Sequence, residues 1–286
     1  MNRLFQCGIA ALAITFGLGA GAHATSLEQV KKAGFIRAAN ANEVPYGYMD
    51  ESGAAKGIGP DVASAVLKSM GVPEIDWTVA PFGSLIPGLK ARRFDMVAAE
   101  QNILPDRCKQ VMFTTPNSSY GEGLLVKAGN PKNLHSYNDF KKNPALKVAI
   151  VTGADQIDFL HGMGIPDSQI VMIQANADAP STVETGRADA YAATELTVAN
   201  LVKKGGAGVE QAKPFTDPVI NGKPVRSYGG LDFRPADKAL YNAFNTALIA
   251  FKKTDAYKKI LTSYGLSDAS VAAARSKTMA ELCAGK

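Results

Sequence analysis

The sequence has few of the side chains on which metal sites and nucleophilic catalysis most often depend. It contains three cysteines, three histidines and one tryptophan in 286 residues. His135 and His161 stand at no zinc-type spacing with a cysteine, and the chain carries no nucleophile-elbow motif. We therefore expect no metal site and no cofactor. Basic residues cluster only in pairs and the net charge is +5, so a nucleic-acid partner is not predicted.

Long apolar runs are also scarce, and the single one lies at the amino terminus. Residues 4–20 are apolar, follow a short basic start, and precede Ala22-His23-Ala24, which places small residues two apart. This pattern predicts a secretory signal peptide spanning residues 1–24. No second stretch of membrane length follows, so we expect a soluble mature protein in the periplasm.

Cleavage of the signal peptide removes one of the three cysteines and leaves Cys108 and Cys283. An even count in an oxidising compartment favours one disulfide, and the alternative is two unpaired thiols. A bridge would tie the carboxyl terminus to the predicted helix that carries Arg107. The remaining chain is long enough for two lobes as readily as one.

What the chain does contain is a regular alternation of strands and helices, in two successive sets. The predicted strands of the first set are residues 35–39, 75–79 and 96–99, and those of the second are 148–151, 170–173 and the end of 186–195. Helices are expected after Gly57, Phe82 and Asp155 and over residues 181–185. This order is typical of open α/β sheets, so the predicted fold class is α/β with two such sheets.

Two glycine-bearing extended segments, residues 120–126 and 228–233, flank the second set. We interpret them as hinge strands on which the chain crosses into a second lobe and returns. The first lobe is then residues 25–119 plus 228–286. The second is residues 120–227, with the hinge strands at its borders.

Arg107 is the first candidate for a ligand contact. A buried strand at residues 96–99 leads into a polar crest, Glu100-Gln101-Asn102, and then into a helix whose first turn holds Pro105 and Arg107. A cation in the first helical turn opposes the helix dipole, which suggests that the guanidinium is there to grip a carboxylate. The alternative is a solvated surface arginine. Residues 186–195 echo residues 93–100, and ligands of open α/β sheets sit beyond such strand ends.

Several motifs, in order, resemble one known family. They are residues 57–63 (GIGPDVA), residues 84–89 (SLIPGL), Asp95 followed by residues 105–107 (PDR), residues 113–116 (FTTP), residues 186–189 (GRAD) and residues 264–266 (YGL). The chain resembles the periplasmic amino-acid-binding proteins of ABC importers, solute-binding family 3. The resemblance implies the type II periplasmic binding protein fold. It also implies a protein, expected to be a monomer, that closes on a small solute and delivers it to a membrane permease.

Within that family the chain is most similar to ectoine- and hydroxyectoine-binding proteins, at residues 42–46, 82–89, 105–108 and 281–286. The resemblance implies that Arg107 takes the ligand carboxylate, that Glu43 pairs with the amidinium, and that Tyr46 and Phe82 cover the cationic ring. The third aromatic position of that cage falls at Asn102, an amide. Ectoine, hydroxyectoine and a polar amino acid therefore all remain candidates.

The remaining candidates lie at the end of residues 186–195, which we call the second crest, and at a helix start. Many amino-acid binders carry an aspartate for the ligand ammonium where this chain has Thr194, with Glu195 beside it. Asp155 follows a glycine turn and is either a helix cap or a ligand contact. The complete predicted ligand-binding set is Glu43, Tyr46, Phe82, Asn102, Arg107, Asp155, Thr194 and Glu195.

Two other functions remain open beside transport. A periplasmic enzyme similar to cyclohexadienyl dehydratase would need a positioned acid or base, for which Glu43, Glu100 or Glu195 could serve. A ligand sensor that partners a membrane receptor would use the same binding physics. The sequence favours a binding protein over an enzyme because neither crest carries a histidine.

Overall fold

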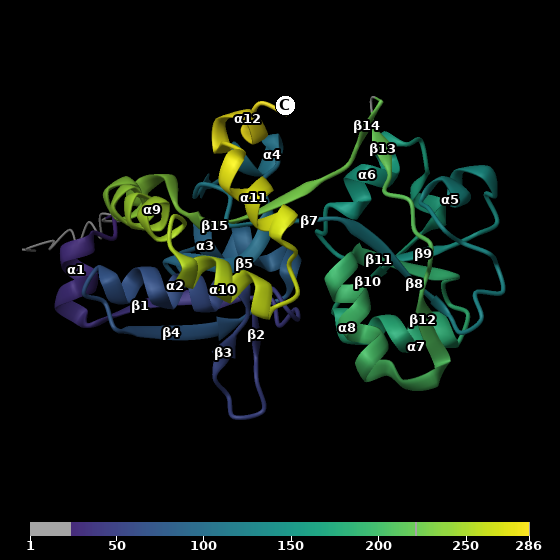
Figure 1. The fold of residues 1–286 in the computed structure, drawn as a ribbon, viewed down its shortest axis with the longest axis horizontal. Coiled ribbons are helices and arrows are strands. Elements are labelled where there is room, and N and C mark those ends of the chain that lie inside the picture. The colour runs from purple at the N-terminus through teal and green to yellow at the C-terminus, as the bar shows by residue number, and fades with distance from the viewer. Residues whose placement is uncertain (1–23, 221, 286) are drawn as a thin grey trace, which may run out of the picture.

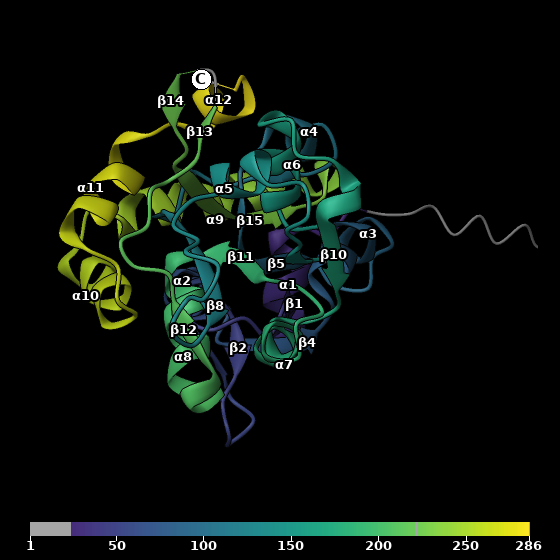
Figure 2. The same ribbon diagram turned by 90° about the vertical axis from the view of Figure 1, so that its right-hand side faces the viewer.

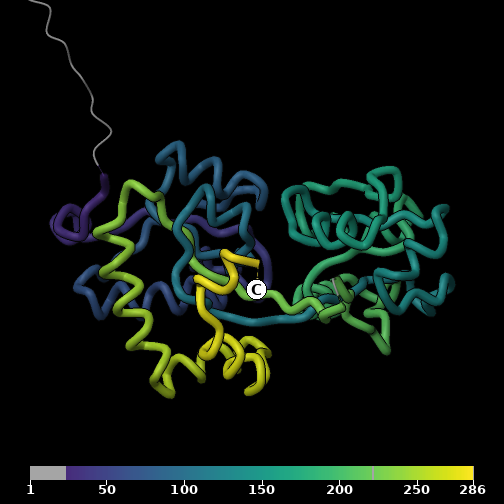
Figure 3. Tube along the Cα trace, turned by 90° about the horizontal axis from the view of Figure 1, so that it is seen from above, coloured from purple at the N-terminus to yellow at the C-terminus, as the bar shows by residue number. Residues whose placement is uncertain are grey.

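The computed structural model describes residues 24–220 and 222–285, and the predicted signal peptide lies almost entirely outside them. Two lobes are visible, each built around its own sheet and linked by two extended segments (Figure 1). Viewed from above, the linking segments run side by side between the lobes (Figure 3). The predicted fold class, two open α/β sheets joined by two crossing strands, is confirmed.

The first sheet is mixed, with the order β4-β1-β5-β15-β6 and with β7 paired to β15. Its strands are β1 (Phe35–Asn40), β4 (Glu74–Val79), β5 (Met96–Asn102), β6 (Met112–Phe113), β7 (Ser118–Tyr120) and β15 (Ser227–Phe233). β1, β4 and β5 are parallel, whereas β15 runs antiparallel to β5, β6 and β7. The returning chain thus completes a sheet that the amino-terminal half began.

Alternation along these strands divides the first core between the two faces of the sheet. Ala38 and Met96 pack against one set of helices, whereas their neighbours Ala39 and Val97 pack against the other. The helices of this lobe are α1 (Leu27–Ala33), α2 (Ile58–Ser69), α3 (Leu85–Lys90), α4 (Pro105–Cys108), α9 (Lys238–Phe251), α10 (Asp255–Ser263), α11 (Asp268–Ser276) and α12 (Met279–Cys283). A small hairpin, β2 (Tyr48–Met49) and β3 (Ala55–Lys56), projects from the lobe (Figure 1).

The second sheet has the order β10-β9-β11-β8-β12. Its strands are β8 (Glu122–Lys127), β9 (Val148–Val151), β10 (Ile170–Ile173), β11 (Ala190–Thr194) and β12 (Val209–Gln211). The helices are α5 (Asn138–Lys142), α6 (Gln156–Gly162), α7 (Ala179–Glu184) and α8 (Glu195–Gly205), and β13 (Val219–Ile220) pairs with β14 (Lys223–Pro224). Figure 2 views the molecule from the side of this lobe.

Short 3-10 turns join several of these elements. They are η1 (Phe82–Ser84), η2 (Asp167–Gln169), η3 (Asn176–Asp178), η4 (Gly206–Gly208) and η5 (Pro235–Asp237). Among the described residues, no helix is both long and apolar enough to cross a membrane.

The crossing points agree with the predicted hinge segments but divide them between the sheets. β7 pairs antiparallel with β15, with Ser227 opposite Tyr120, where the two segments lie side by side. After Gly121 the chain enters the second sheet as β8, whereas β15 belongs to the first sheet along its whole length. The bounds of 25–119 plus 228–286 and of 120–227 stay a prediction.

One sequence prediction needs correction. The polar crest Glu100-Gln101-Asn102 is not a loop beyond the strand but the end of β5 itself. Gln101 and Asn102 pair with Gly230 and Gly229 of β15, which extends the ladder past the apolar residues. All three crest side chains are buried, so these polar residues mark the covered carboxyl end of a central strand.

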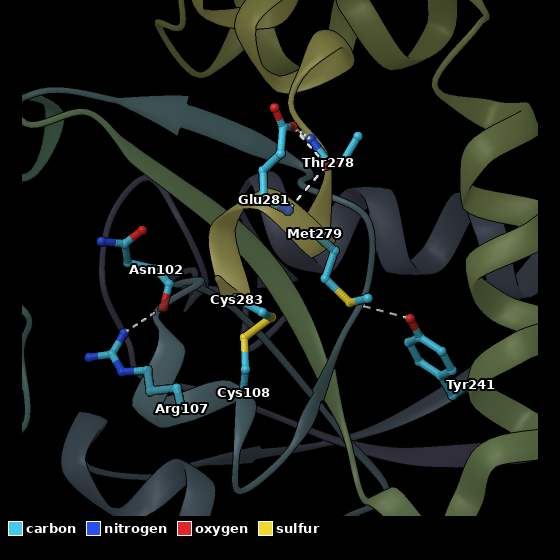
Figure 4. The surroundings of a disulfide bond; sticks show 8 residues. All are labelled: Asn102, Arg107, Cys108, Tyr241, Thr278, Met279, Glu281 and Cys283. Atoms are coloured by element: carbon cyan, nitrogen blue, oxygen red, sulfur yellow. Dashed lines mark hydrogen bonds between the residues drawn. A yellow bond between two sulfur atoms is a disulfide. The ribbon is translucent and has the colours of Figure 1, made fainter. Parts of the chain in front are cut away.

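The predicted disulfide is confirmed. Cys108 and Cys283 are bonded, with Cα atoms 5.7 Å apart and a sequence separation of 175. Figure 4 shows the bridge fastening α12 to α4, next to Arg107. The carboxyl-terminal helix is therefore part of the first lobe.

Candidate ligand-binding site

A cavity lies between the lobes, and both contribute to its walls. The first lobe and the crossing strand supply Glu43, Tyr46, Phe82, Ala99, Glu100, Asn102 and Tyr120. The second lobe supplies Val151, Ala154, Asp155, Gln156, Asn176, Tyr191, Ala193 and Thr194. Among these described residues are three carboxylates and four aromatic rings, and none is a lysine or arginine.

Two hydrogen bonds join the lobes on the Glu43 side of the cavity. The Tyr46 hydroxyl donates to Thr194 Oγ1 at 2.9 Å, and Thr197 Oγ1 donates to Glu43 Oε1 at 2.7 Å. Thr194 is the N-cap of α8, and its Oγ1 also accepts from the Thr197 backbone N–H. The cap that begins this helix therefore also fixes the position of the Tyr46 ring.

Two further bonds join the lobes on the opposite side. Asn102 Nδ2 donates to Asp155 Oδ2 at 2.6 Å, and Arg107 Nη2 donates to the Gly153 carbonyl at 2.9 Å. A Cβ added to Gly153 would stand 2.7 Å from the Cα of Gly83, so the two backbones touch and only glycine fits. With these contacts on both sides, the lobes are closed on each other in this structure.

Aromatic rings form much of the wall between these contacts. The Tyr46 and Tyr120 rings are 4.9 Å apart between centroids and tilted by 58°. Phe82 opens η1 directly after Pro81, and the Arg107 guanidinium lies 5.6 Å from its ring centroid. The electron-rich faces of such rings attract a cation.

Burial changes the acid–base behaviour of the carboxylates. Burial raises the pKa of Glu43 to about 7, against the opposing effect of its hydrogen bond from Thr197. Burial likewise raises the pKa of Glu100 to about 7, although Ser118 and Asn117 donate to its carboxylate. In the described part of the chain no cation offsets the burial of Glu43, so a positively charged ligand group would stabilise its ionised form.

The pKa of Glu122, which lies on β8 just behind the cavity, is also raised. Burial, reinforced by the nearby Asp155 carboxylate, raises its pKa well above the usual value. Gln156 and Ser227 donate to its two oxygens. The neutral acid is therefore favoured at this position.

The sequence pattern of the bacterial extracellular solute-binding proteins, family 3, matches residues 36–267. The chain belongs to this family.

Two relatives of known name align with most of the chain. A probable amino-acid ABC transporter periplasmic-binding protein, y4tE of Sinorhizobium fredii, is 51% identical, over 92% of this chain and 87% of its own. ABC transporter arginine-binding protein 1 of Escherichia coli is 28% identical, over 88% and 95%.

Two solved structures are similar in fold. The crystal structure of EhuB in complex with hydroxyectoine is 32% identical, with a TM-score of 0.82 over 91% of this chain and 98% of that one. AncCDT-1, an ancestral amino-acid-binding protein and precursor of cyclohexadienyl dehydratase, is 27% identical, with a TM-score of 0.71 over 83% and 98%.

Most of the ligand-binding residues predicted from the sequence line the cavity. Glu43, Tyr46, Phe82, Asn102, Asp155 and Thr194 line it. Asp155 is the N-cap of α6, but its side chain makes no capping hydrogen bond and instead accepts from Asn102. Asp155 therefore lines the cavity without capping α6 through its side chain, and its predicted contact with a ligand stays a prediction.

Arg107 and Glu195 lie outside the lining. The Arg107 guanidinium lies over the Phe82 ring and donates to the Asn102 carbonyl, as Figure 4 shows. It also donates to the Gly153 carbonyl of the second lobe, so in this closed arrangement it joins the lobes. Glu195 is the first residue of α8, and its Oε1 accepts from the Gly121 N–H at 3.4 Å, beside the crossing strand. Its neighbour Thr194, one position earlier, faces the cavity instead.

Sequence reasoning missed several lining residues. Tyr191 and Ala193 alternate on β11, a period-2 signal that could have placed both on one face. For Tyr120 the sequence predicts only a place in a crossing strand. Asn176 lies in η3 after β10, where no periodic signal marks it.

Proposed function

We propose that this protein is the periplasmic solute-binding component of an ABC importer and delivers a small zwitterion to a membrane permease. Residues 1–24 are its cleaved signal peptide, and residues 25–119 plus 228–286 and residues 120–227 are its two lobes. The solute is ectoine, hydroxyectoine or a polar amino acid with a cationic group facing the cavity. It is bound and released unchanged, by a monomer.

The observation that carries this proposal is the charge of the cavity lining. Glu43, Glu100 and Asp155 approach one enclosed space, and the lining contains no cationic side chain among the described residues. Each of these carboxylates accepts a hydrogen bond, yet burial of several carboxylates without a cation in the lining remains costly, and a cation enclosed with them reduces that cost. The rings of Tyr46, Phe82, Tyr120 and Tyr191 add an attraction for diffuse positive charge.

The relatives support the same class of solute. EhuB was crystallised with hydroxyectoine, the Sinorhizobium relative is named as an amino-acid-binding protein, and the Escherichia coli relative is named for arginine. The solutes named for two of them carry a delocalised cationic group and a carboxylate. In this proposal Glu43 and the rings receive the cationic group, and Arg107, which lies outside the lining beside Phe82, receives the carboxylate.

Thermal unfolding of the ligand-stripped mature protein tests the proposal. The panel is ectoine, hydroxyectoine, L-arginine, proline and glycine betaine, with glutarate, a dicarboxylate that has no ammonium group, as the anionic control. A ligand at about a hundred times its Kd adds about 2.7 kcal/mol, which raises Tm by several degrees. A rise with glutarate and none with the cation-bearing zwitterions would overturn the proposed solute class.

The role of Arg107 needs a separate comparison, because the same side chain joins the lobes. If it receives the carboxylate, Arg107→Ala weakens binding of a zwitterion such as L-arginine far more than binding of agmatine, its analogue without the carboxylate. Equal losses for both would mean that Arg107 only holds the lobes together.

Recovery of the bound solute with unchanged mass after long incubation separates binding from enzymatic turnover.

A further inference from the structure

Thr25, the residue that follows the proposed cleavage site, contacts a buried carboxylate of the first lobe. Its backbone nitrogen donates to Asp237 Oδ1 at 2.7 Å, across 212 positions of sequence. Asp237 is fully buried. It occupies the N-cap of α9, yet its side chain makes no capping hydrogen bond. An aspartate at this position ordinarily caps its own helix, so its contact with Thr25 replaces the usual partner.

The second carboxylate oxygen of Asp237 has no well-directed donor in the part of the chain that the structure describes. Arg234 Nη2 stands 2.6 Å from Asp237 Oδ2, but the geometry is not that of a hydrogen bond, and this buried oxygen has no hydrogen-bond partner. The Arg234 guanidinium donates instead to Asp95 Oδ1 at 2.8 Å. Among the described residues, the Thr25 nitrogen is therefore the one well-directed donor to the Asp237 carboxylate.

Cleavage changes the chemistry of this donor. In the uncut chain the Thr25 nitrogen is a peptide amide, with one N–H and no charge. After cleavage behind Ala24 it is an α-ammonium, with three N–H groups and a unit positive charge. One N–H can keep the bond to Oδ1 while a second reaches the unsatisfied Oδ2. Charge-assisted hydrogen bonds of this kind are about twice as strong as neutral ones.

We propose that Asp237 is an acceptor site for the mature amino terminus. Removal of the signal peptide creates an ion pair between the Thr25 α-ammonium and this buried carboxylate, which fastens α1 to the start of α9. The inference rests on the proposed cleavage position. It makes the processed protein more stable than any form that carries residues ahead of Thr25.

The charges around the new terminus determine its pH dependence. Asp237 and Asp95 face it as carboxylates, and Arg234 and Arg37 face it as cations. Both cations are bonded to Asp95, and Arg234 is also within ion-pair distance of Asp237. An α-amino group ordinarily has a pKa of about 7.7–8.0, and the buried Asp237 carboxylate raises it in the folded state. A raised folded-state pKa gives stabilisation that is fully present below about pH 8. That stabilisation is lost as pH rises through the folded-state value.

The test compares the chain that begins at Thr25 with the same chain carrying Gly-Ser ahead of Thr25. We expect the extension to lower the ligand-free Tm by about 2–4 °C at pH 7. The difference should disappear near pH 10, where the α-amine is neutral in both forms. Equal Tm values at pH 7, or a difference that persists at pH 10, would overturn the proposal.

The variant Asp237→Asn, made with and without the Gly-Ser extension, completes a double-mutant cycle. This variant keeps the side-chain shape, and we expect it to remove the Tm difference between the two forms. An unchanged difference would contradict the ion pair. Should the variant fail to fold, the wild-type protein still decides the question. Acylation of its α-amine at pH 8 should be at least several-fold slower than that of a peptide beginning Thr-Ser-Leu-Glu, and equal rates would rule out the pairing.

Two controls separate this inference from the proposed function. The mass of the exported protein should correspond to a start at Thr25, and any other start removes the site. Solute affinity should be the same with and without the Gly-Ser extension, because Thr25 does not line the cavity. Failure of the Tm prediction with normal solute binding would overturn the acceptor site alone.

Discussion

The two lobes share one type of sheet but contribute to the cavity in different ways. The first lobe presents Glu43, Tyr46 and Phe82 from segments that follow its strands. The second presents Asp155 and Thr194 from the N-cap positions of α6 and α8. These two caps hydrogen-bond back to the first lobe, so they act only when the lobes are closed. We therefore propose that the first lobe makes the first contacts with the solute, and that contacts from the second lobe then favour closure.

The lobes also differ in how their frames are held. The first contains the Cys108–Cys283 bridge and the buried pair of Arg234 with Asp95. The described part of the second lobe has no disulfide. There, Gln169 Nε2 donates to three backbone carbonyls and joins the turn before β10 to α5 and the loop that follows it. The first lobe is thus cross-linked covalently, whereas the described part of the second lobe is held by packing and hydrogen bonds. This difference is compatible with a first lobe that captures the solute before the second lobe closes on it.

Removal of the bridge should give the largest effect. We expect the double substitution Cys108→Ser with Cys283→Ser to lower stability by about 3 kcal/mol, because the unfolded chain regains the freedom that the long closed loop removed. For lobes of this size that corresponds to a fall of about 6–12 °C in Tm by calorimetry. Reduction of the native protein is the matched control. A Tm unaffected by either change would break the contrast between the lobes.

Removal of the first-lobe charge should give the next largest effect. Glu43→Gln keeps the side-chain size but replaces a charge-assisted contact, which contributes about 1.5–3 kcal/mol. We expect the Kd for a cation-bearing zwitterion to rise about 10- to 100-fold in calorimetric titrations. The matched control is Glu195→Gln, a carboxylate outside the lining, whose Kd should change less than about twofold. Equal losses in both variants would mean that net charge alone attracts the solute.

Solute binding should also depend on pH through Glu43. Its pKa is raised to about 7, so a proton competes with the ligand cation below that value. We expect Kd to be constant above about pH 8 and to rise by up to about tenfold per unit below pH 7. Glu43→Gln should flatten this dependence, and an unflattened profile would assign it to another group.

Ligand-free stability should change with pH in the opposite sense. The folded-state pKa values of Glu43 and Glu100 lie above the ordinary glutamate value of 4.5, so between about pH 4.5 and 7 the folded protein holds more protons than the unfolded chain. Stability from these groups therefore falls as pH rises through that window. Thermal unfolding of the stripped protein at pH 5 and pH 8 measures it.

The architecture could be predicted because it follows from periodicity. The strands predicted at residues 148–151 and 170–173 have those same bounds in β9 and β10. Short buried apolar runs bounded by turn residues leave little choice in an α/β chain. The bridge followed from an even cysteine count in an exported protein, without any geometry.

Side-chain direction at helix starts could not be predicted. Thr194 and Glu195 are neighbours, yet one faces the cavity and the other faces the crossing strand, because the helix begins between them. Arg107 was expected to point at the solute, but in the closed arrangement the Gly153 carbonyl of the opposite lobe takes one of its donors. Such contacts depend on how the lobes meet, and no local pattern of residues encodes that.

The smallest expected effect tests the closure role of the second lobe. Tyr46→Phe keeps the ring that faces the solute but removes the hydroxyl that donates to Thr194 across the cleft. Loss of one such hydrogen bond costs about 0.5–1.5 kcal/mol, so Kd should rise about 2- to 10-fold, mostly through faster dissociation in stopped-flow measurements. Tyr120→Phe is the matched control, because the Tyr120 hydroxyl donates to the Glu100 carbonyl beside the same cavity without spanning the two crests. If both variants raise the dissociation rate equally, the hydroxyls act by shaping the cavity, and the Thr194 cap has no separate part in closure.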